Sequence, residues 1–171
     1  MRRYGLSGRT DRGASAVEFA LTLPIFIILF IGIIEFGWYF FVQHTIQYAT
    51  REGMRLALVG RTLPGPGGNP MTREASIIQT IRNNAALAVN PARVTVYIYP
   101  VTSASAYQDP ANWQDYGSEE GNPNAGGTDD YRRVRSTYDH RFFTPLIGSF
   151  FGSGNTVTIR AEGTYRNERF D

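Results

Sequence analysis

An uncharged apolar run near the N-terminus constrains this chain more than any other feature. Residues 19–34 contain no charged side chain, and the aromatic residues 38–41 follow them. As a helix rising 1.5 Å per residue, the uncharged run is roughly 24 Å long. Its extension into the aromatic residues gives the roughly 30 Å of a bilayer core. The sequence therefore predicts one membrane-spanning helix surrounded by membrane lipid.

The flanking residues predict the direction in which this helix crosses the membrane. Residues 1–13 hold four arginines against one aspartate, whereas the formal net charge of the whole chain is only +2. Basic residues before a span and aromatic residues after it place the N-terminus in the cytoplasm and the rest of the chain outside. The small net charge gives no indication of nucleic acid as a partner.

A cleaved secretory signal is the alternative interpretation, because it also has a basic start and an apolar middle. Such a signal needs small residues at a cleavage site after its apolar region. Here large aromatic residues follow the run, and the small residues Gly-Ala-Ser-Ala, at 13–16, precede it. This order favours a helix that the mature protein keeps.

The same order resembles that of a type IV prepilin. In that family a short basic leader ends in Gly, the chain is cut after it, and Glu is the fifth mature residue; Gly13, Ala14 and Glu18 match these positions. More narrowly, RGASAVEFALTLP, GIIEFG and YATREGMRLA resemble the TadE-like family, pilin-like proteins of the tight adherence (Flp) pilus. The resemblance is strongest over residues 12–58 and continues more weakly in TPLIGSF and IRAEGTYRNE.

This resemblance implies a function and a set of partners. It implies a pseudopilin, a minor subunit or assembly component of an Flp-type pilus, cut by a prepilin peptidase and inserted in the bacterial inner membrane. The implied partners are the peptidase, other pilins and pseudopilins, and the inner-membrane assembly platform. The alternative function is a membrane-anchored extracytoplasmic binding or scaffold module that is not polymerised.

Glu18 has a physical reason for its position in this reading. A charge in a membrane span is costly unless it finds a partner. In a polymer of parallel, staggered helices, Glu18 of one subunit can approach the new α-amino group of Ala14 on its neighbour. The alternative is that Glu18 lies in the lipid headgroup layer, where a charge near a helix end is tolerated.

A seam of residues at alternating spacings of three and four runs along the same helix. Its members are Ile28, Gly32, Glu35, Tyr39, Val42, Ile46, Ala49, Gly53 and Leu56. Small residues on such a seam permit close backbone approach. With Glu18, the seam residues Gly32, Glu35, Ala49 and Gly53 are therefore predicted to serve assembly or helix packing. The alternative for residues 42–56 is that they pack only on the chain's own globular domain.

The rest of the chain predicts an α+β head. After a leader (1–13) and the long helix (14–59), a Gly- and Pro-rich linker covers 60–70, and the extracytoplasmic head covers 71–171. A second helix is predicted over 71–89, with Thr72 as its N-cap, and its predicted buried face is Ala75, Ile78, Ile81, Ala85 and Ala88.

Alternating apolar residues predict three antiparallel strands in the head, over 93–100, 131–140 and 155–166. Between the last two, RFFTPLIGSFFG is predicted to form a short helix or buried turn that closes one end of the core. The fold class is thus α+β and pilin-like, with a long membrane-spanning helix, a second helix and a small three-stranded sheet.

Residues 102–130 form an acidic loop whose oxygens are of the kind that calcium prefers. Its carboxylates are Asp109, Asp115, Glu119, Glu120, Asp129 and Asp130. Their spacing matches no EF-hand, and the Gly, Pro, Asn and Ser content favours a solvated loop over an ion site.

Enzyme chemistry has little support in the sequence. The chain contains no cysteine and only two histidines, His44 and His140. Neither histidine has the sequence neighbours of a catalytic triad or a metal site, and no Gly-rich phosphate loop is present. We expect neither catalysis nor a cofactor.

Overall fold

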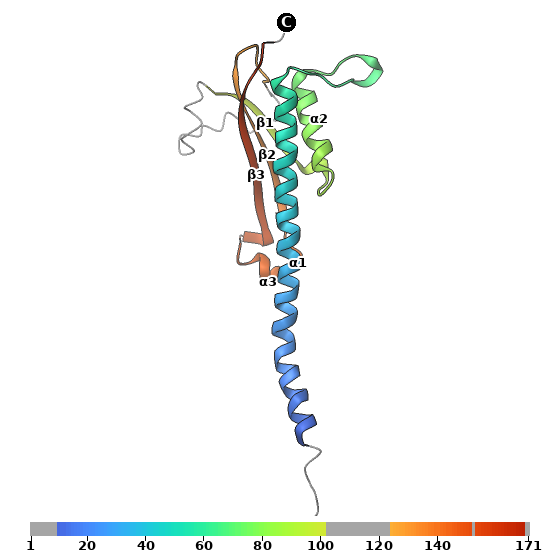
Figure 1. Ribbon diagram of the computed structural model, residues 1–171, viewed down its shortest axis with the longest axis vertical. Coiled ribbons are helices and arrows are strands. Elements are labelled where there is room, and N and C mark those ends of the chain that lie inside the picture. The colour runs from blue at the N-terminus through green and yellow to red at the C-terminus, as the bar shows by residue number, and fades with distance from the viewer. Residues whose placement is uncertain (1–9, 102–123, 152, 170–171) are drawn as a thin grey trace, which may run out of the picture. The chain divides into compact units, whose positions relative to one another are not determined.

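The computed structural model describes residues 10–101, 124–151 and 153–169. Their main elements are α1 (Thr10–Leu58), α2 (Arg73–Ala85), β1 (Thr95–Pro100), β2 (Tyr131–Arg141), α3 (Pro145–Gly148) and β3 (Thr156–Arg166). The chain divides into two compact units, Met1–Trp38 and Tyr39–Asp171. The predicted α+β fold class, with a long helix, a second helix and a three-stranded sheet, is confirmed (Figure 1).

The described part of the first unit is α1 up to Trp38. Residues 13–31 are all exposed in this unit, and Leu21 and Ile25 expose 69% of their surface. Within the described part of the chain, one helix, Gly13–Leu58, is long and apolar enough to cross a membrane. A helix that is apolar all round and uncovered is typical of a membrane span. The structure therefore fits single-pass membrane anchoring.

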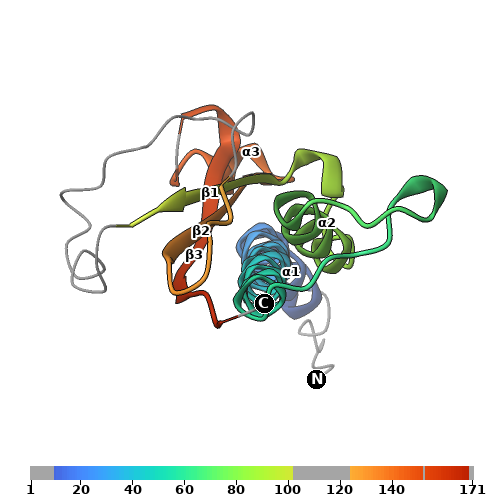
Figure 2. The ribbon, with the colours of Figure 1, turned by 90° about the horizontal axis from the view of Figure 1, so that it is seen from above.

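The second unit, the head, is built on an antiparallel sheet in the order β1-β2-β3. Its register aligns Val96 with Ser136 and Ser136 with Ala161. Side chains of one sheet face meet the helices, so Val96, Val134 and Ala161 are buried. On β3 the alternating pattern predicts that Thr158, Arg160 and Glu162 face outward, and all three are exposed. Figure 2 shows the head part of α1 beside α2, next to the sheet.

The head part of α1 contacts both the sheet and α2. The Thr50 hydroxyl hydrogen bonds with the Ser136 hydroxyl of β2 at 2.9 Å. Gly53 faces α2, and a Cβ added there would overlap the Ile81 side chain. On β3, Gly163 leaves room for Met54. Hence α1 supplies the centre of the head's core.

The second helix starts as predicted, and Ile81 and Ala85 are buried as predicted, but the centre of its buried face is shifted toward residues 76 and 77. Thr72 is the N-cap, and its Oγ accepts a hydrogen bond from the Ala75 amide at 3.2 Å. Ile77 is fully buried, whereas Ile78 is only partly buried. The polar Ser76 shares the buried face because its hydroxyl donates to the Thr72 carbonyl (2.7 Å) and accepts from the Leu63 amide (2.9 Å). A satisfied serine can be buried, which the apolar pattern alone did not predict.

The second helix is also shorter than predicted. It ends at Ala85 rather than near Val89. The amides of Ala88 and Val89 both donate to the Ala85 carbonyl, which turns the chain toward β1 before the predicted stop.

The connection between β2 and β3 was predicted to be a short helix or buried turn, and only part of that is right. The short helix is present as α3. Phe142 and Ile147 are buried, but Phe143 is 72% exposed and Phe150 is 78% exposed. The expectation of burial was wrong for these side chains because a four-residue helix can turn only a few of them inward.

Candidate processing and assembly site

The predicted processing residues lie on the exposed first part of α1. Gly13, Ala14 and Glu18 all belong to the exposed class. A Cβ added at Gly13 would have no atom within 4 Å. At 1.5 Å per residue, Gly13 and Glu18 are about 7.5 Å apart along the helix axis. The bond between Gly13 and Ala14 is therefore sterically open on this unit.

The backbone around Glu18 is helical, and Thr22 supports it. The Thr22 hydroxyl lies 3.0 Å from the Glu18 carbonyl and 3.2 Å from the Phe19 carbonyl. The helix continues through Pro24, although proline has no amide hydrogen to donate. Because the Thr22 hydroxyl donates to carbonyls of the preceding turn, it is not left as an unsatisfied polar group in an apolar medium.

Further along the first unit, Gly32 and Glu35 are less exposed than their neighbours. Gly32 is half-buried and Glu35 is 2% exposed, whereas Ile33 and Ile34 are exposed. Both are predicted seam residues, whereas Ile28, which is also on the seam in this unit, is 51% exposed. The role of Gly32 and Glu35 in assembly stays a prediction.

The seam residues of the head have a different environment. Val42, Ile46 and Ala49 are at most 1% exposed, and Gly53 is buried against α2. This is the alternative left open by the sequence: residues 42–56 pack on the head's own core. Ala49 and Gly53 therefore contribute to the packing of the head within one chain.

A comparison with protein families identifies the segment that holds these residues. Residues 13–55 match the family model for TadE-like proteins. This chain carries a TadE-like segment. The resemblance predicted from the sequence is confirmed over these residues, and it indicates a Tad pilus-associated protein. No curated protein and no solved structure matches the chain.

The TadE-like segment ends just before a polar cluster that the sequence did not predict. Arg73 donates to the carbonyls of Ala57 (3.0 Å) and Gly126 (2.6 Å) and to the side chain of Asn167 (3.1 Å). Asn167 donates to the carbonyls of Ala125 (2.9 Å) and Gly127 (2.7 Å). We call Arg73 and Asn167 the clamp, because their hydrogen bonds join the C-terminal end of α1, the first turn of α2, residues 124–127 and the chain after β3.

Burial also sets the chemistry of a tyrosine near this clamp. Tyr165 of β3 is 6% exposed. Burial raises the pKa of its hydroxyl to about 12, although the nearby Arg73 and Arg132 guanidiniums lower it. Tyr165 is therefore a neutral core residue at ordinary pH.

The described part of the acidic loop is held by arginines. Asp129 lies 3.0 Å from Arg166 and 3.2 Å from Arg169, and Asp130 lies 2.9 Å from Arg132. The other four candidates, Asp109, Asp115, Glu119 and Glu120, lie outside the described residues. Within the described ranges no group of three or more potential metal ligands occurs.

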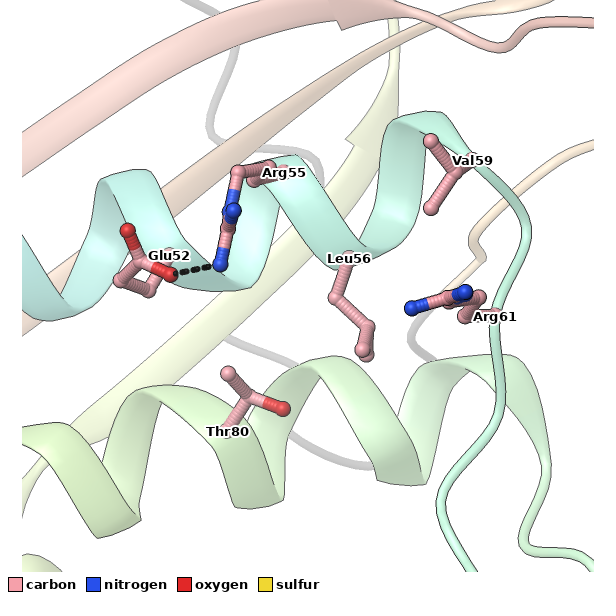
Figure 3. Close-up of a pocket in the computed structure, with 6 residues that line it drawn as sticks. All are labelled: Glu52, Arg55, Leu56, Val59, Arg61 and Thr80. Atoms are coloured by element: carbon pink, nitrogen blue, oxygen red, sulfur yellow. Dashed lines mark hydrogen bonds and ion pairs between the residues drawn. The ribbon is translucent and has the colours of Figure 1, made fainter.

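One groove of the head lies beside the end of the TadE-like segment (Figure 3). Its volume is about 400 Å³, and its lining residues are Glu52, Arg55, Leu56, Val59, Arg61 and Thr80. Glu52 and Arg55 form an ion pair at 2.8 Å. The lining combines the apolar Leu56 and Val59 with the charged Glu52, Arg55 and Arg61, and it includes no nucleophile with an adjacent base.

The two histidines also lie apart from this groove. His140 is buried, and its ring contacts those of Tyr39 (5.6 Å between centroids) and Phe142 (5.3 Å). His44 is exposed on α1. His140 thus packs as an aromatic side chain.

Proposed function

We propose that this chain is a pilin-like minor subunit or assembly component of a tight adherence (Flp-type) pilus. In this proposal a prepilin peptidase cuts it after Gly13, and α1 anchors the mature chain in the bacterial inner membrane with its head outside. Its partners are other pilins and pseudopilins and the inner-membrane assembly platform. The role needs no catalytic group or cofactor.

One observation supports this proposal above the others. The TadE-like match begins at Gly13, and Glu18 follows at the fifth position after it, on a helix whose residues 13–31 are exposed. An exposed apolar helix needs lipid or other helices around it. A leader that ends where the match begins fits a chain that is cut there.

The test is mass spectrometry of the mature N-terminus after expression with a prepilin peptidase. We expect the wild-type chain to begin at Ala14. Gly13→Leu should keep all 13 leader residues, because the peptidase must accommodate the residue before the cut. Gly37→Leu is the matched control, since Gly37 also has open space around its Cα, and it should be cut normally.

Two results would contradict parts of the proposal. An N-terminus beyond residue 41 would mean ordinary secretory cleavage. A mature chain that is cut at Ala14 but stays absent from sheared pili and their membrane bases would favour an anchored scaffold module instead.

A further inference from the structure

The connection between β2 and β3 exposes a group of large apolar side chains. Phe143, Leu146, Phe150 and Phe151 expose 72%, 52%, 78% and 47% of their surfaces, and we name these four residues the apolar tip. Residues 142–155, which contain the tip, include no charged residue. Single exposed apolar residues are normal, whereas a cluster marks a contact surface.

The apolar tip is held in place by the residues around it. The Phe142 amide donates to the Asn155 carbonyl at 3.0 Å, and the Asn155 side-chain amide donates to the Phe142 carbonyl. A Cβ added at Gly148 would overlap the Asn155 side chain. Because both ends of the connection are tied together, the exposure of the tip is a fixed feature of the head.

Ring contacts place the tip at one end of the head. Phe151 stacks on Phe142 (5.5 Å between centroids), and Phe142 stacks on Tyr39 (5.9 Å). Tyr39 is the first residue of the head unit and directly follows the apolar run of α1. Figure 1 shows α3 at one end of the sheet. The apolar tip therefore lies at the end of the head where α1 enters it, near Tyr39.

The same end of the head carries further aromatic surface. Phe40 and Phe41 on α1 are 51% and 40% exposed. Aromatic side chains prefer the interface between lipid and water. Arg141, at the start of the connection, is exposed.

We infer that the apolar tip inserts into the interfacial layer of the membrane that α1 crosses. It gives the head a second lipid contact beside the helix, at the depth of about 5–10 Å that interfacial apolar side chains reach. Two contacts restrict the tilt of the head more than a single helix does. The inference rests on the membrane anchoring in the proposed function.

The test uses the full chain in liposomes. Because the natural chain has no cysteine, a single cysteine can carry an environment-sensitive fluorophore. The variants are Leu146→Cys in the tip, Leu29→Cys in the apolar run and Val59→Cys as the control. Val59 is also an exposed apolar residue, and it lies 20 residues beyond Tyr39, or about 30 Å along a helix.

Lipids carrying a nitroxide near the headgroup should quench the fluorophore at 146, and its emission should shift to the blue. Lipids with a nitroxide deep in the acyl chain should quench the fluorophore at 29 instead. The fluorophore at 59 should respond only to a water-soluble quencher. Adding Phe143→Ser and Phe150→Ser should make the fluorophore at 146 behave like that at 59, because both phenylalanines are largely exposed and the fold does not need them.

Three outcomes would overturn the inference. If position 146 responds like position 59 while position 29 is lipid-quenched, anchoring holds and the tip faces water. If position 146 is shielded from both quenchers only at high protein density, a second copy covers the tip. If position 29 is not lipid-quenched, the anchoring itself fails, and the inference fails with it.

Discussion

At the scale of single residues, Tyr165 shows how burial changes a group that looks ordinary in the sequence. Its pKa in the folded head is about 12, raised from 10.0. The unfolded chain loses this proton near pH 10, whereas the folded chain keeps it. Stability from this group is therefore complete below pH 10 and is lost as the pH rises toward 12.

We predict that Tyr165→Phe will flatten the alkaline loss of stability. Two pKa units correspond to about 2–3 kcal/mol of unfolding free energy between pH 10 and 12. Denaturant unfolding of the purified chain in detergent, compared at pH 8 and pH 11, should show about half of this difference, because the loss grows by about 1.4 kcal/mol per pH unit above pH 10. Tyr48→Phe is the control, since Tyr48 is 52% exposed. Equal alkaline losses in wild type and Tyr165→Phe would refute the assignment.

Local signals in the sequence predicted single residues well where the cause was local. The cap at Thr72 needs only an amide three residues away. The clamp of Arg73 and Asn167 joins residues 94 positions apart. Neither partner stands in a recognisable motif, so their contact depends on the tertiary fold and could not be predicted.

At the scale of elements, α1 has two environments along one continuous helix. Residues 13–31 are exposed on an apolar surface, and residues 42–57 include the buried Val42, Ile46, Ala49 and Ala57. The seam spacing alone could not distinguish packing against other subunits from packing within the head. Burial distinguishes them for the head part, because its seam is already covered by α2 and the sheet.

We predict that Gly53→Ala will destabilise the head by about 1–3 kcal/mol, the usual range for overpacking a filled core. The added Cβ would meet the Ile81 side chain, and the helices would have to move apart. Thermal unfolding followed by circular dichroism measures the loss. Gly37→Ala is the matched control, because it adds the same methyl to the same helix in open space. That control should be neutral or slightly stabilising.

The double variant Gly53→Ala, Ile81→Val tests whether the overlap with the Ile81 side chain causes the loss of stability. Removing a methyl from Ile81 makes room for the new Cβ, so part of the lost stability should return. If Gly53→Ala changes the thermal stability no more than Gly37→Ala does, that result would contradict the close approach of α1 and α2 at Gly53.

The sequence predicted the strands better than it predicted the connection between them. Alternation fixes which face of β3 is inward, so Ile159 and Ala161 are buried as expected. The segment RFFTPLIGSFFG has apolar residues without alternation. Apolar content alone does not show whether a side chain is buried in the protein core or lies on the outside of the head. That ambiguity is why Phe143 and Phe150 were expected inside and lie outside.

At the scale of the whole molecule, the TadE-like match extends over both compact units. It begins at Gly13 and ends at residue 55, within the part of α1 that fills the head's core. The same helix therefore contains the predicted processing residues in the first unit and, in the second unit, residues of the head's core such as Ile46 and Ala49.

The last prediction concerns Glu18 and the assembled polymer. Glu18→Ala should still insert in the membrane, because losing a charge makes a span more favourable. The prepilin peptidase should still cut the variant after Gly13, because the substitution does not change Gly13. It should nevertheless be depleted from sheared pili or their bases, since the α-amino group of Ala14 on the neighbouring subunit loses its partner. Removing one side of a buried ion pair costs roughly 3–5 kcal/mol, enough to deplete the variant at least tenfold.

The measurement is quantitative mass spectrometry of the sheared and membrane fractions, normalised to the mature chain. Glu168→Ala is the matched control, because Glu168 is an exposed glutamate near the C-terminus of the head, and it should assemble normally. Glu18→Asp keeps the charge on a shorter side chain and should recover part of the incorporation. Full incorporation of Glu18→Ala would leave the headgroup layer as the remaining explanation for this charge, because a pairing contact that stabilises the polymer cannot be removed without loss.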